Sequence, residues 1–285
     1  MTEPLGLVAV LDLERIELDV FRGHQPGDER QRVFGGQVAA QALVAAGRTV
    51  DADRAVHSLH AYFLRPGDPS VPIVYTVDRI RDGRSFTTRR VVGIQHGKAI
   101  FNLQASFAVP EEGLEHQDPL PQVPPPDDLP TMEEVLRPVG GPAHAWWDRV
   151  GPIEARPITE PAQVVRARGG EGHEVSRLWM RTTEPLPDDP LVHVCAAAFA
   201  SDMTLLDAVL VRHAMTWDDD LAAGASLDHA MWFHAPFRAD QWFLYEQQSG
   251  WAGGARGLAR GVISTPDGRR VVSVVQEGLL RVRQP

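Results

Sequence analysis

The chain has 285 residues and a mass of 31.4 kDa, enough for two domains of ordinary size or one large sheet. Hydrophobic residues make up 43% and charged residues 23%, a composition that excludes a disordered chain and a collagen-like fibre. Lys and Arg number 28 against 38 Asp and Glu, a formal net charge of −10, so duplex nucleic acid is not expected as a partner.

The cysteine content and the apolar segments narrow the class further. Cys195 is the single cysteine, so an internal disulfide framework and a Cys-rich metal site are excluded. The first ten residues lack the basic region and cleavage site of a signal peptide. No uninterrupted apolar run approaches the ~18 residues of a membrane-spanning helix. We therefore expect a cytoplasmic protein without membrane insertion.

In the first half, an alanine-rich segment at 36–46 ends at Gly47 and predicts a helix. Strand signals follow at 71–80, 85–94 and 99–109, where residues rich in Val, Ile, Thr and Phe alternate in polarity. Asp82-Gly83 and His96-Gly97 separate them, as in tight hairpins. This half is predicted to be a helix followed by an antiparallel meander.

A Pro-rich, acidic segment at 110–130 predicts an extended surface linker. The second half repeats the first half's order, with an alanine-rich segment at 194–200 and strands at 227–233, 241–248, 257–264 and 270–282. We expect an α+β fold of two like modules at 1–110 and 161–285, joined by a linker and connection at 111–160.

A repeat of pattern supports the duplication. Phe63 and Phe233 are 170 positions apart, and Tyr75 and Tyr245 keep the same offset. Further along, Gln104 faces Gln276 at an offset of 172 (276 − 104). Chance likeness between two β-rich segments is the alternative to a shared fold.

Several common catalytic motifs are missing. The sequence has no G-x-S-x-G, no Walker A loop, no G-x-G-x-x-G after a strand and no H-E-x-x-H. Cys195 lies in an alanine run where a thiol is usually an inert apolar group. His57 with His60, or His229 with His234, would point to opposite faces of a strand, so a metal site is not expected, and His57 is kept as a cleft candidate.

Longer motifs then occur in a recognisable order: VFGGQV at 33–38, VHSLHAYFLRPGD at 56–68, DGRSF at 82–86, SD at 201–202, LDHAMWFH at 227–234 and VQEG at 275–278. In this order they resemble the acyl-CoA thioesterase II (TesB-type) family, from about Leu7 to Arg283. The resemblance implies a double hotdog fold, in which each of two fused modules wraps an antiparallel sheet around a central helix. It also implies hydrolysis of fatty acyl-CoA to free acid and CoA without a cofactor, as part of fatty acid metabolism.

Carried over from that family, the water-activating residues fall on Asp202, Ser226 and Gln276. Asp202 would act as general base, while the hydroxyl and the amide would orient the water. From local sequence alone, Asp202 would be a helix cap, Ser226 a loop residue and Gln276 a solvent-facing strand position. No equivalent aspartate follows the first helix, so one active site per chain is expected, with Gln104 at the matching place in the first half.

The remaining candidates concern the substrate. Backbone N–H groups of Gly36 and Gln37, at the start of the first helix, are candidate donors to the oxyanion. The phosphates of CoA need local cations, and the densest basic stretch could supply them, although a solvated sheet face is the alternative. The candidates are Arg65, Arg84, Arg89 and Arg90, in a stretch that also holds Arg79 and Arg81.

Two other function classes fit parts of this pattern. A hotdog enoyl-CoA hydratase would need a D-x-N-x-x-H motif, which residues 202–207 lack. A non-catalytic acyl-CoA-binding or sensing protein would share the same pocket. The expected partners are the acyl-CoA substrate and further copies of the chain, as a homodimer or homotetramer, because fused modules leave sheet edges at their ends.

Overall fold

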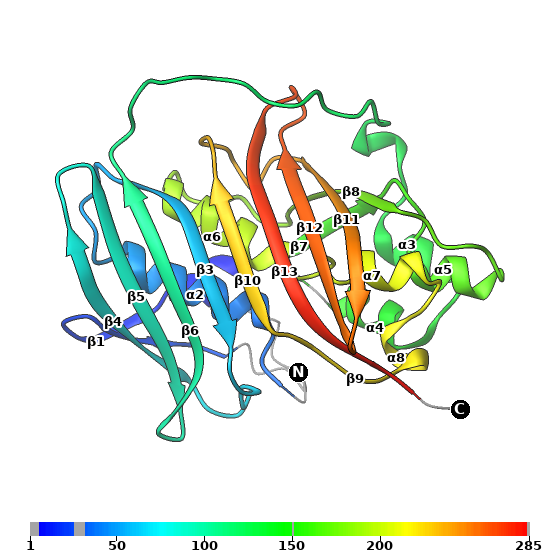
Figure 1. Ribbon diagram of the computed structural model, residues 1–285, viewed down its shortest axis with the longest axis horizontal. Coiled ribbons are helices and arrows are strands. Elements are labelled where there is room, and N and C mark those ends of the chain that lie inside the picture. The colour runs from blue at the N-terminus through cyan, green and yellow to red at the C-terminus, as the bar shows by residue number, and fades with distance from the viewer. Residues whose placement is uncertain (1–5, 26–31, 150, 284–285) are drawn as a thin grey trace.

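The computed structural model describes residues 6–25, 32–149 and 151–283. In this part of the chain one 13-stranded antiparallel sheet curves around two central helices, α2 (Gly35–Gly47) and α6 (Pro190–Ser201) (Figure 1). The strand order is β1-β2-β4-β5-β6-β3-β10-β13-β12-β11-β8-β7, and β9 pairs with β13 off this path. Each half thus surrounds one helix, as the double hotdog prediction requires.

The first half supplies six strands to one side of the sheet. They are β1 (Glu14–Glu17), β2 (Val20–Gly23), β3 (Ala55–Phe63), β4 (Ile73–Asp82), β5 (Phe86–Gln95) and β6 (Lys98–Ala108). The short helix α1 (Leu7–Leu11) packs against α2. The meander of β4, β5 and β6 and the helix α2 agree with the prediction, whereas β1 and β2 carried no signal that we recognised.

The second half supplies the remaining strands and most of the short helices. Its strands are β7 (Ile153–Pro157), β8 (Val175–Thr182), β9 (Leu221–Ser226), β10 (Asp228–Phe233), β11 (Phe243–Gly253), β12 (Arg256–Ser264) and β13 (Arg270–Val282). Its other helices are α3 (Met132–Leu136), α4 (Gly141–Arg149), α5 (Ala162–Ala167), α7 (Asp207–Arg212) and α8 (Trp217–Asp220). Because β7 pairs with β8, this sheet begins before the boundary predicted at 161.

The two halves meet where β3 pairs with β10, and the pairing register reveals their relation. His60 lies opposite Ala230, and the pairs on either side of it are Asp228 with Tyr62 and Trp232 with Ser58. The two residues of the His60–Ala230 pair are 170 positions apart, the same offset that separates Phe63 from Phe233. Each half contributes antiparallel strands and one central helix, and the pair His60–Ala230, where the halves meet, has the offset of the sequence repeat.

The same register corrects one correspondence. In the first half Leu59 pairs with Ala105 on β6. In the second half Ala230 pairs with Val275 on β13, so the next pair along is His229 with Gln276. Leu59 and His229 are 170 residues apart, so Ala105, not Gln104, is the counterpart of Gln276. Gln104 is exposed and lies on the opposite face of the sheet.

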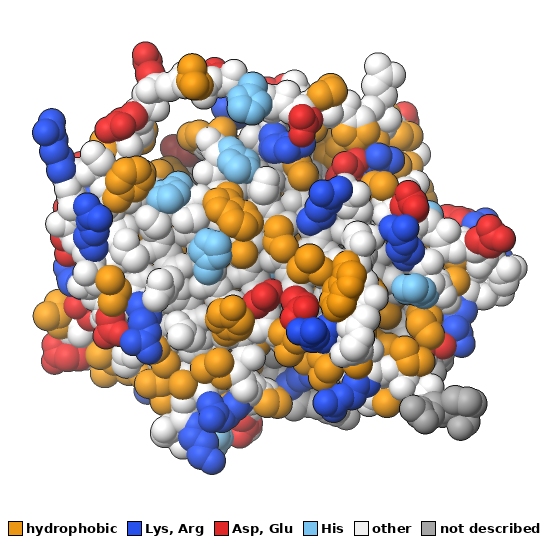
Figure 2. All heavy atoms as spheres, viewed as in Figure 1, with side chains coloured by type: hydrophobic (Ala, Val, Ile, Leu, Met, Phe, Trp, Pro, Cys, Tyr) orange, Lys and Arg blue, Asp and Glu red, His pale blue; other side chains and the backbone are white. Residues whose placement is uncertain are grey.

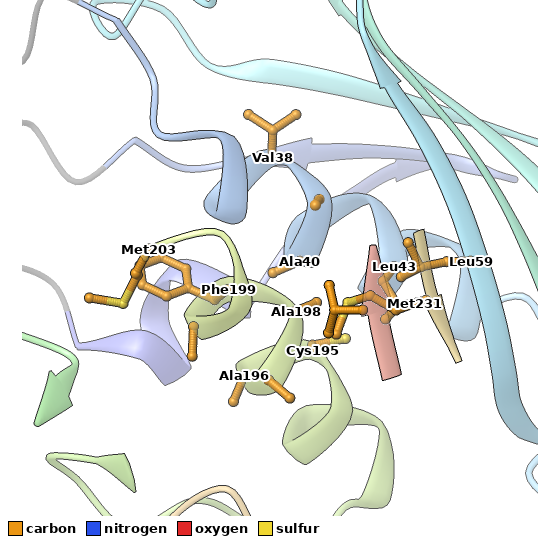
Figure 3. Packing of buried hydrophobic residues seen from close by; sticks show 14 of the residues in the cluster. Val38, Ala40, Leu43, Leu59, Cys195, Ala196, Ala198, Phe199, Met203 and Met231 are labelled. Carbon is orange, nitrogen blue, oxygen red and sulfur yellow. The ribbon is translucent and has the colours of Figure 1, made fainter. Parts of the chain in front are cut away.

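Small side chains let α2 and α6 approach each other closely. The facing segments are alanine-rich, and buried residues such as Ala40, Leu43, Ala198 and Phe199 fill the interface (Figure 3). A Cβ at Gly36 would lie 2.5 Å from the carbonyl oxygen of Phe199, closer than two such atoms can pack. The N-terminal turn of α2 is therefore held against the C-terminal turn of α6.

The segment between β6 and α3 crosses the surface in an extended conformation, broken by the short 3-10 helix η1 (Pro126–Asp128) (Figure 1). Side chains and backbone of the second half hold it at several points, three of which are hydrogen bonds of Gln117 and Pro124. Gln117 donates through Nε2 to Gly268 O (2.7 Å) and accepts from the Arg270 N–H (3.1 Å), and Trp179 Nε1 donates to Pro124 O (2.9 Å). The predicted linker is thus a strap bound to the second half.

Candidate active site

The three residues of the proposed triad come from three different elements of the second half. Asp202 follows directly on α6 as its C-cap, Ser226 ends β9, and Gln276 lies on β13. The long strand β13 pairs first with β10, up to Val275, and then with β9 from Gly278 onward. Gln276 lies where β13 passes from one partner to the other, beside the end of α6.

The structure brings these three side chains together. Ser226 Oγ donates to Asp202 Oδ1 at 3.1 Å, and Gln276 Nε2 donates to the same oxygen at 2.5 Å. Gln276 is fully buried, whereas Asp202 and Ser226 keep part of their surface accessible to solvent. The arrangement is a carboxylate held by a hydroxyl and a carboxamide.

The first half also contributes to this site, through the N-terminus of α2. The backbone N–H of Gly36 donates to the Asp202 carboxylate. The positive end of the α2 dipole thus points at this carboxylate, which favours its ionised form. In this structure the Gly36 N–H is engaged by Asp202, so of the two predicted oxyanion donors only the Gln37 N–H, one position into the helix, is left for that task.

Burial dominates the electrostatics of Asp202. Loss of contact with water raises the pKa of its carboxyl to about 6. Four groups act in the opposite direction and lower this pKa: the hydrogen-bond donors Gln276, Ser226 and Gly36 N–H, and the charge of Arg32. A carboxyl with such a pKa is ionised at neutral pH and basic enough to take a proton from water. Sequence reasoning did not find Arg32, whose guanidinium also donates to Gly224 O at 2.8 Å.

A second carboxyl nearby does not share these partners. Asp207, the first residue of α7, accepts a hydrogen bond from Trp217 Nε1 at 2.5 Å, and burial raises its pKa to about 7. It had no signal in the sequence, because a lone aspartate at a helix start is ordinarily a capping residue.

His57 lies away from the triad. It is on β3, where its Nε2 is 2.8 Å from Ser106 Oγ and its ring contacts Phe86 edge-on. Half-exposed Ser106 belongs to the outer face of the sheet, turned away from α2 and α6. These helices lie behind the strands in Figure 1, so Figure 2 shows the outer face, whereas Asp202 is at the end of α6. The cleft role predicted for His57 is therefore not supported by its position.

The four arginines predicted to meet CoA phosphates are dispersed. Arg89 is 1% exposed and is bound to Thr49 and Asp82, so it is a structural cation and not a phosphate ligand. Its neighbour Arg90 is on the outer face, paired with Asp78 at 3.4 Å. Arg84 is in the turn between β4 and β5, at the end of the sheet where β3 begins.

Arg65 differs from these three. It follows the end of β3, the same end at which Tyr62 pairs with Asp228 next to the site. It is exposed, and its guanidinium donates to Ala99 O at 2.5 Å. Of the four predicted cations it is the one that follows β3 at the end where this strand pairs with Asp228. Among the described residues no group of His, Cys, Asp and Glu side chains could hold a metal ion.

Fold and site define a class: two fused hotdog modules with a partly buried, hydrogen-bonded carboxylate at the ends of two opposed helices. Sequence models of known families agree, since the one described as "Acyl-CoA thioesterase" matches residues 153–279 and the one described as "Acyl-CoA thioesterase N-terminal domain" matches residues 25–108. The chain belongs to the acyl-CoA thioesterase family.

Individual relatives cover nearly its whole length. The chain is 41% identical to the human protein named acyl-coenzyme A thioesterase 8, over 97% of this chain and 89% of the relative. It is 36% identical to acyl-CoA thioesterase 2 of Haemophilus influenzae, with 97% of each covered. The crystal structure of acyl-CoA thioesterase II TesB2 from Mycobacterium marinum superposes with a TM-score of 0.80 at 42% identity, over 98% of this chain and 99% of that one.

These comparisons confirm the family and the double hotdog fold that the sequence motifs suggested. A further observation concerns membranes: within the described part of the chain, each helix is too short or too polar to cross a bilayer.

Proposed function

We propose that this chain hydrolyses fatty acyl-CoA thioesters to the free acid and CoA, with a water molecule activated by Asp202 and oriented by Ser226 and Gln276. One observation carries the proposal: a hydroxyl and a carboxamide from distant parts of the chain converge on one oxygen of a carboxylate whose pKa is raised to about 6.

The reaction follows from these groups. As the water oxygen bonds to the thioester carbonyl carbon, its proton passes to Asp202 and the carbonyl oxygen takes up negative charge. The Gln37 N–H, in the first turn of α2, would donate to that oxyanion. When the tetrahedral intermediate collapses, the carbon–sulfur bond breaks and Asp202 returns the proton to the leaving thiolate. Water and acyl-CoA are consumed, and acid and CoA thiol are formed.

The CoA phosphates and the thioester carbonyl of the substrate need different partners. The CoA phosphates need cations near the mouth of the site, and Arg65, exposed at that end of β3, meets this need better than the buried Arg89. The carbonyl must reach the helix ends, where Asp202 and the α2 N-terminus lie. We also expect the chain to act in the cytoplasm as a homodimer or homotetramer.

The test is thiol release from a panel of acyl-CoAs by the wild type and by Asp202→Asn, Ser226→Ala and Ser226→Thr. We expect Asp202→Asn to lose about 10²–10⁴-fold in kcat, the range for a general base. Ser226→Thr keeps the hydroxyl and is the matched control for Ser226→Ala. Undiminished release by folded Asp202→Asn would refute the mechanism, and tight binding without release by the wild type would favour a sensor.

A further inference from the structure

His229 lies on β10 next to the triad but outside it. It is 1% exposed, and its Nε2 is 2.9 Å from Ser201 Oγ, on the last residue of α6 and next to Asp202. On the other side of the ring, the register of β10 and β13 puts Gln276 directly across from His229. The imidazole thus lies between Ser201 and Gln276.

Two polar atoms at this place have no partner. Within the described part of the chain, His229 Nδ1 and Gln276 Oε1 are both buried and neither has a standard hydrogen bond. The two side chains are nonetheless close enough for hydrogen bonding from Gln276 to act on the pKa of His229. One hydrogen bond, from Nδ1–H to Oε1, would satisfy both buried atoms, each of which is costly to leave alone.

The direction of this bond is fixed by the charge on Asp202. An ionised carboxylate only accepts hydrogen bonds, so the Gln276 amide must turn its NH₂ group to Asp202, and its Oε1 then faces His229. Since Oε1 also only accepts, Nδ1 must carry the ring proton. Burial lowers the pKa of His229 to about 4, so the ring is neutral and Nε2 is left to accept from the Ser201 hydroxyl.

A different arrangement exists for Ser201, whose hydroxyl is also 3.0 Å from Ala198 O. If it donated there, Nε2 would carry the ring proton and Nδ1 would be an acceptor. Nδ1 and Gln276 Oε1 would then be two acceptors facing each other. Turning the amide over would instead set its oxygen 2.5 Å from Asp202 Oδ1. Only the first arrangement pairs every buried atom while Asp202 is ionised.

The first half of the chain provides an internal comparison. At the positions equivalent to His229 and Gln276 it has Leu59 and Ala105, which form the corresponding cross-strand pair and are 0% and 1% exposed. An apolar pair is therefore compatible with the fold here. The first half has no counterpart of Asp202, and it also lacks both His229 and Gln276. The polar pair is therefore associated with the chemistry of the second half.

We propose that His229 is a positioning residue that fixes the Gln276 amide by an Nδ1–H···Oε1 hydrogen bond, with Ser201 holding the ring in the required tautomer. The proposal rests on the function proposed above, in which Gln276 orients the water. Without His229 the amide can rotate, so Asp202 loses a hydrogen-bond donor and the water is no longer oriented by Gln276. The effect is expected on turnover, not on binding of acyl-CoA.

The kinetic test compares His229→Leu with His229→Asn. Leucine is the residue that the first half carries at this place, whereas the Nδ2 of asparagine can replace the Nδ1 donor. We expect His229→Leu to lose about 10–100-fold in kcat, the range for one buried hydrogen bond, with KM changed less than about twofold. His229→Asn should stay within about threefold of the wild type. In His229→Leu the acid limb of kcat should move to higher pH, because Asp202 has lost a donor.

Wild-type kcat and an unshifted pH profile in folded His229→Leu would overturn the proposal. So would an equal loss of kcat in His229→Leu and His229→Asn when both unfold at the wild-type temperature. A merely structural histidine would lower stability without moving the pH profile.

A second measurement does not depend on catalysis. Nitrogen-15 NMR of the histidine-labelled full chain reports which ring nitrogen of His229 carries the proton. We expect Nδ1–H with bare Nε2 at pH 7–8, and the opposite tautomer would refute the hydrogen bond. If Gln276→Ala keeps full activity, the proposed function fails instead, while the tautomer still reports on the contact itself.

Discussion

Gly35 in the first half lies directly against Asp202 in the second: a Cβ at Gly35 would come within 2.6 Å of Asp202 Oδ2 and 2.9 Å of the Phe63 ring. Since Gly35 begins α2, alanine there satisfies the backbone and is favoured by helix propensity. Both the Asp202 carboxylate and the Phe63 ring must shift to relieve these contacts, and the carboxylate has the shorter one. We therefore expect Gly35→Ala to lower kcat at least about tenfold, with less than about 1 kcal/mol change in stability.

The control is Gly113→Ala in the strap, where a Cβ would meet nothing within 4 Å. It should keep wild-type kcat and melting temperature. Thiol release and thermal unfolding measured side by side distinguish the two variants, and an active Gly35→Ala would show that the position of Asp202 is not critical.

The raised pKa of Asp202 predicts the pH dependence of turnover. Because the base must be ionised, kcat should rise with pH through about 6 and then level off. Ser226 lowers this pKa by donating to Oδ1. The substitution Ser226→Ala should therefore move the rise of kcat to higher pH and also lower the value at which kcat levels off. Ser226→Thr should leave the limb in place. A limb near the ordinary aspartate pKa of 3.8 would contradict the burial argument.

The same pKa predicts a gain in stability when Asp202 is neutralised. Its pKa is higher in the folded protein than in the unfolded chain, so the folded state loses stability as pH rises from about 4 to about 6 and keeps that loss above it. At pH 8 Asp202→Asn should be more stable than the wild type by about 1–3 kcal/mol, and near pH 4 the difference should vanish. Urea unfolding at both pH values checks this.

Asp207→Asn is the matched control for this substitution. Burial raises the pKa of Asp207 to about 7, so its neutralisation should also stabilise the protein at pH 8. Since Asp207 shares no partner with Asp202, thiol release should be unchanged. Equal loss of activity in both variants would mean that the effect is not specific to Asp202.

Arg89 should contribute to stability and not to substrate binding. Its guanidinium bonds Thr49 Oγ1 at 2.8 Å, Thr49 O at 3.0 Å and Asp82 Oδ1 at 2.6 Å. We expect Arg89→Leu to destabilise the fold by about 2–4 kcal/mol with KM for acyl-CoA unchanged. Arg90→Gln, at the half-exposed outer position, should change stability by less than about 0.5 kcal/mol. A fivefold or larger rise in KM for folded Arg89→Leu would restore a binding role.

The sequence predicted those elements whose periodicity is strong. The two alanine-rich helices and the strands β4, β5, β6, β12 and β13 lie where alternation and Asp-Gly or His-Gly turns placed them. Strands β1 and β7 were missed because they are only four and five residues long and lie at the edges of the sheet. Strand β9, with the sequence LAAGAS, has no β-branched residue, and it is a strand because β13 pairs with it.

At the site, the sequence predicted which residues take part, but it did not predict which face of the sheet a side chain points to. Family motifs pointed to Asp202, Ser226 and Gln276, which are in contact in the structure. Whether Arg89 or Arg90 points inward depends on the register of β5, and adjacent arginines carry no pattern that fixes it. Gln104 and Ala105 are adjacent and therefore point to opposite faces of the sheet. The sequence comparison matched Gln104 to Gln276 by residue type, at an offset of 172 instead of 170, and so selected the residue on the wrong face.

The strap between the modules is held at Gln117 and Pro124, while the modules themselves are joined by the ladder between β3 and β10. We therefore expect the two halves to stay together after the strap is cut in the folded protein. A protease that nicks the exposed residues around Gly113 would leave two fragments that migrate as one particle under native conditions and separate only in detergent. By the same reasoning, we expect the two halves to reassemble when they are expressed as separate polypeptides.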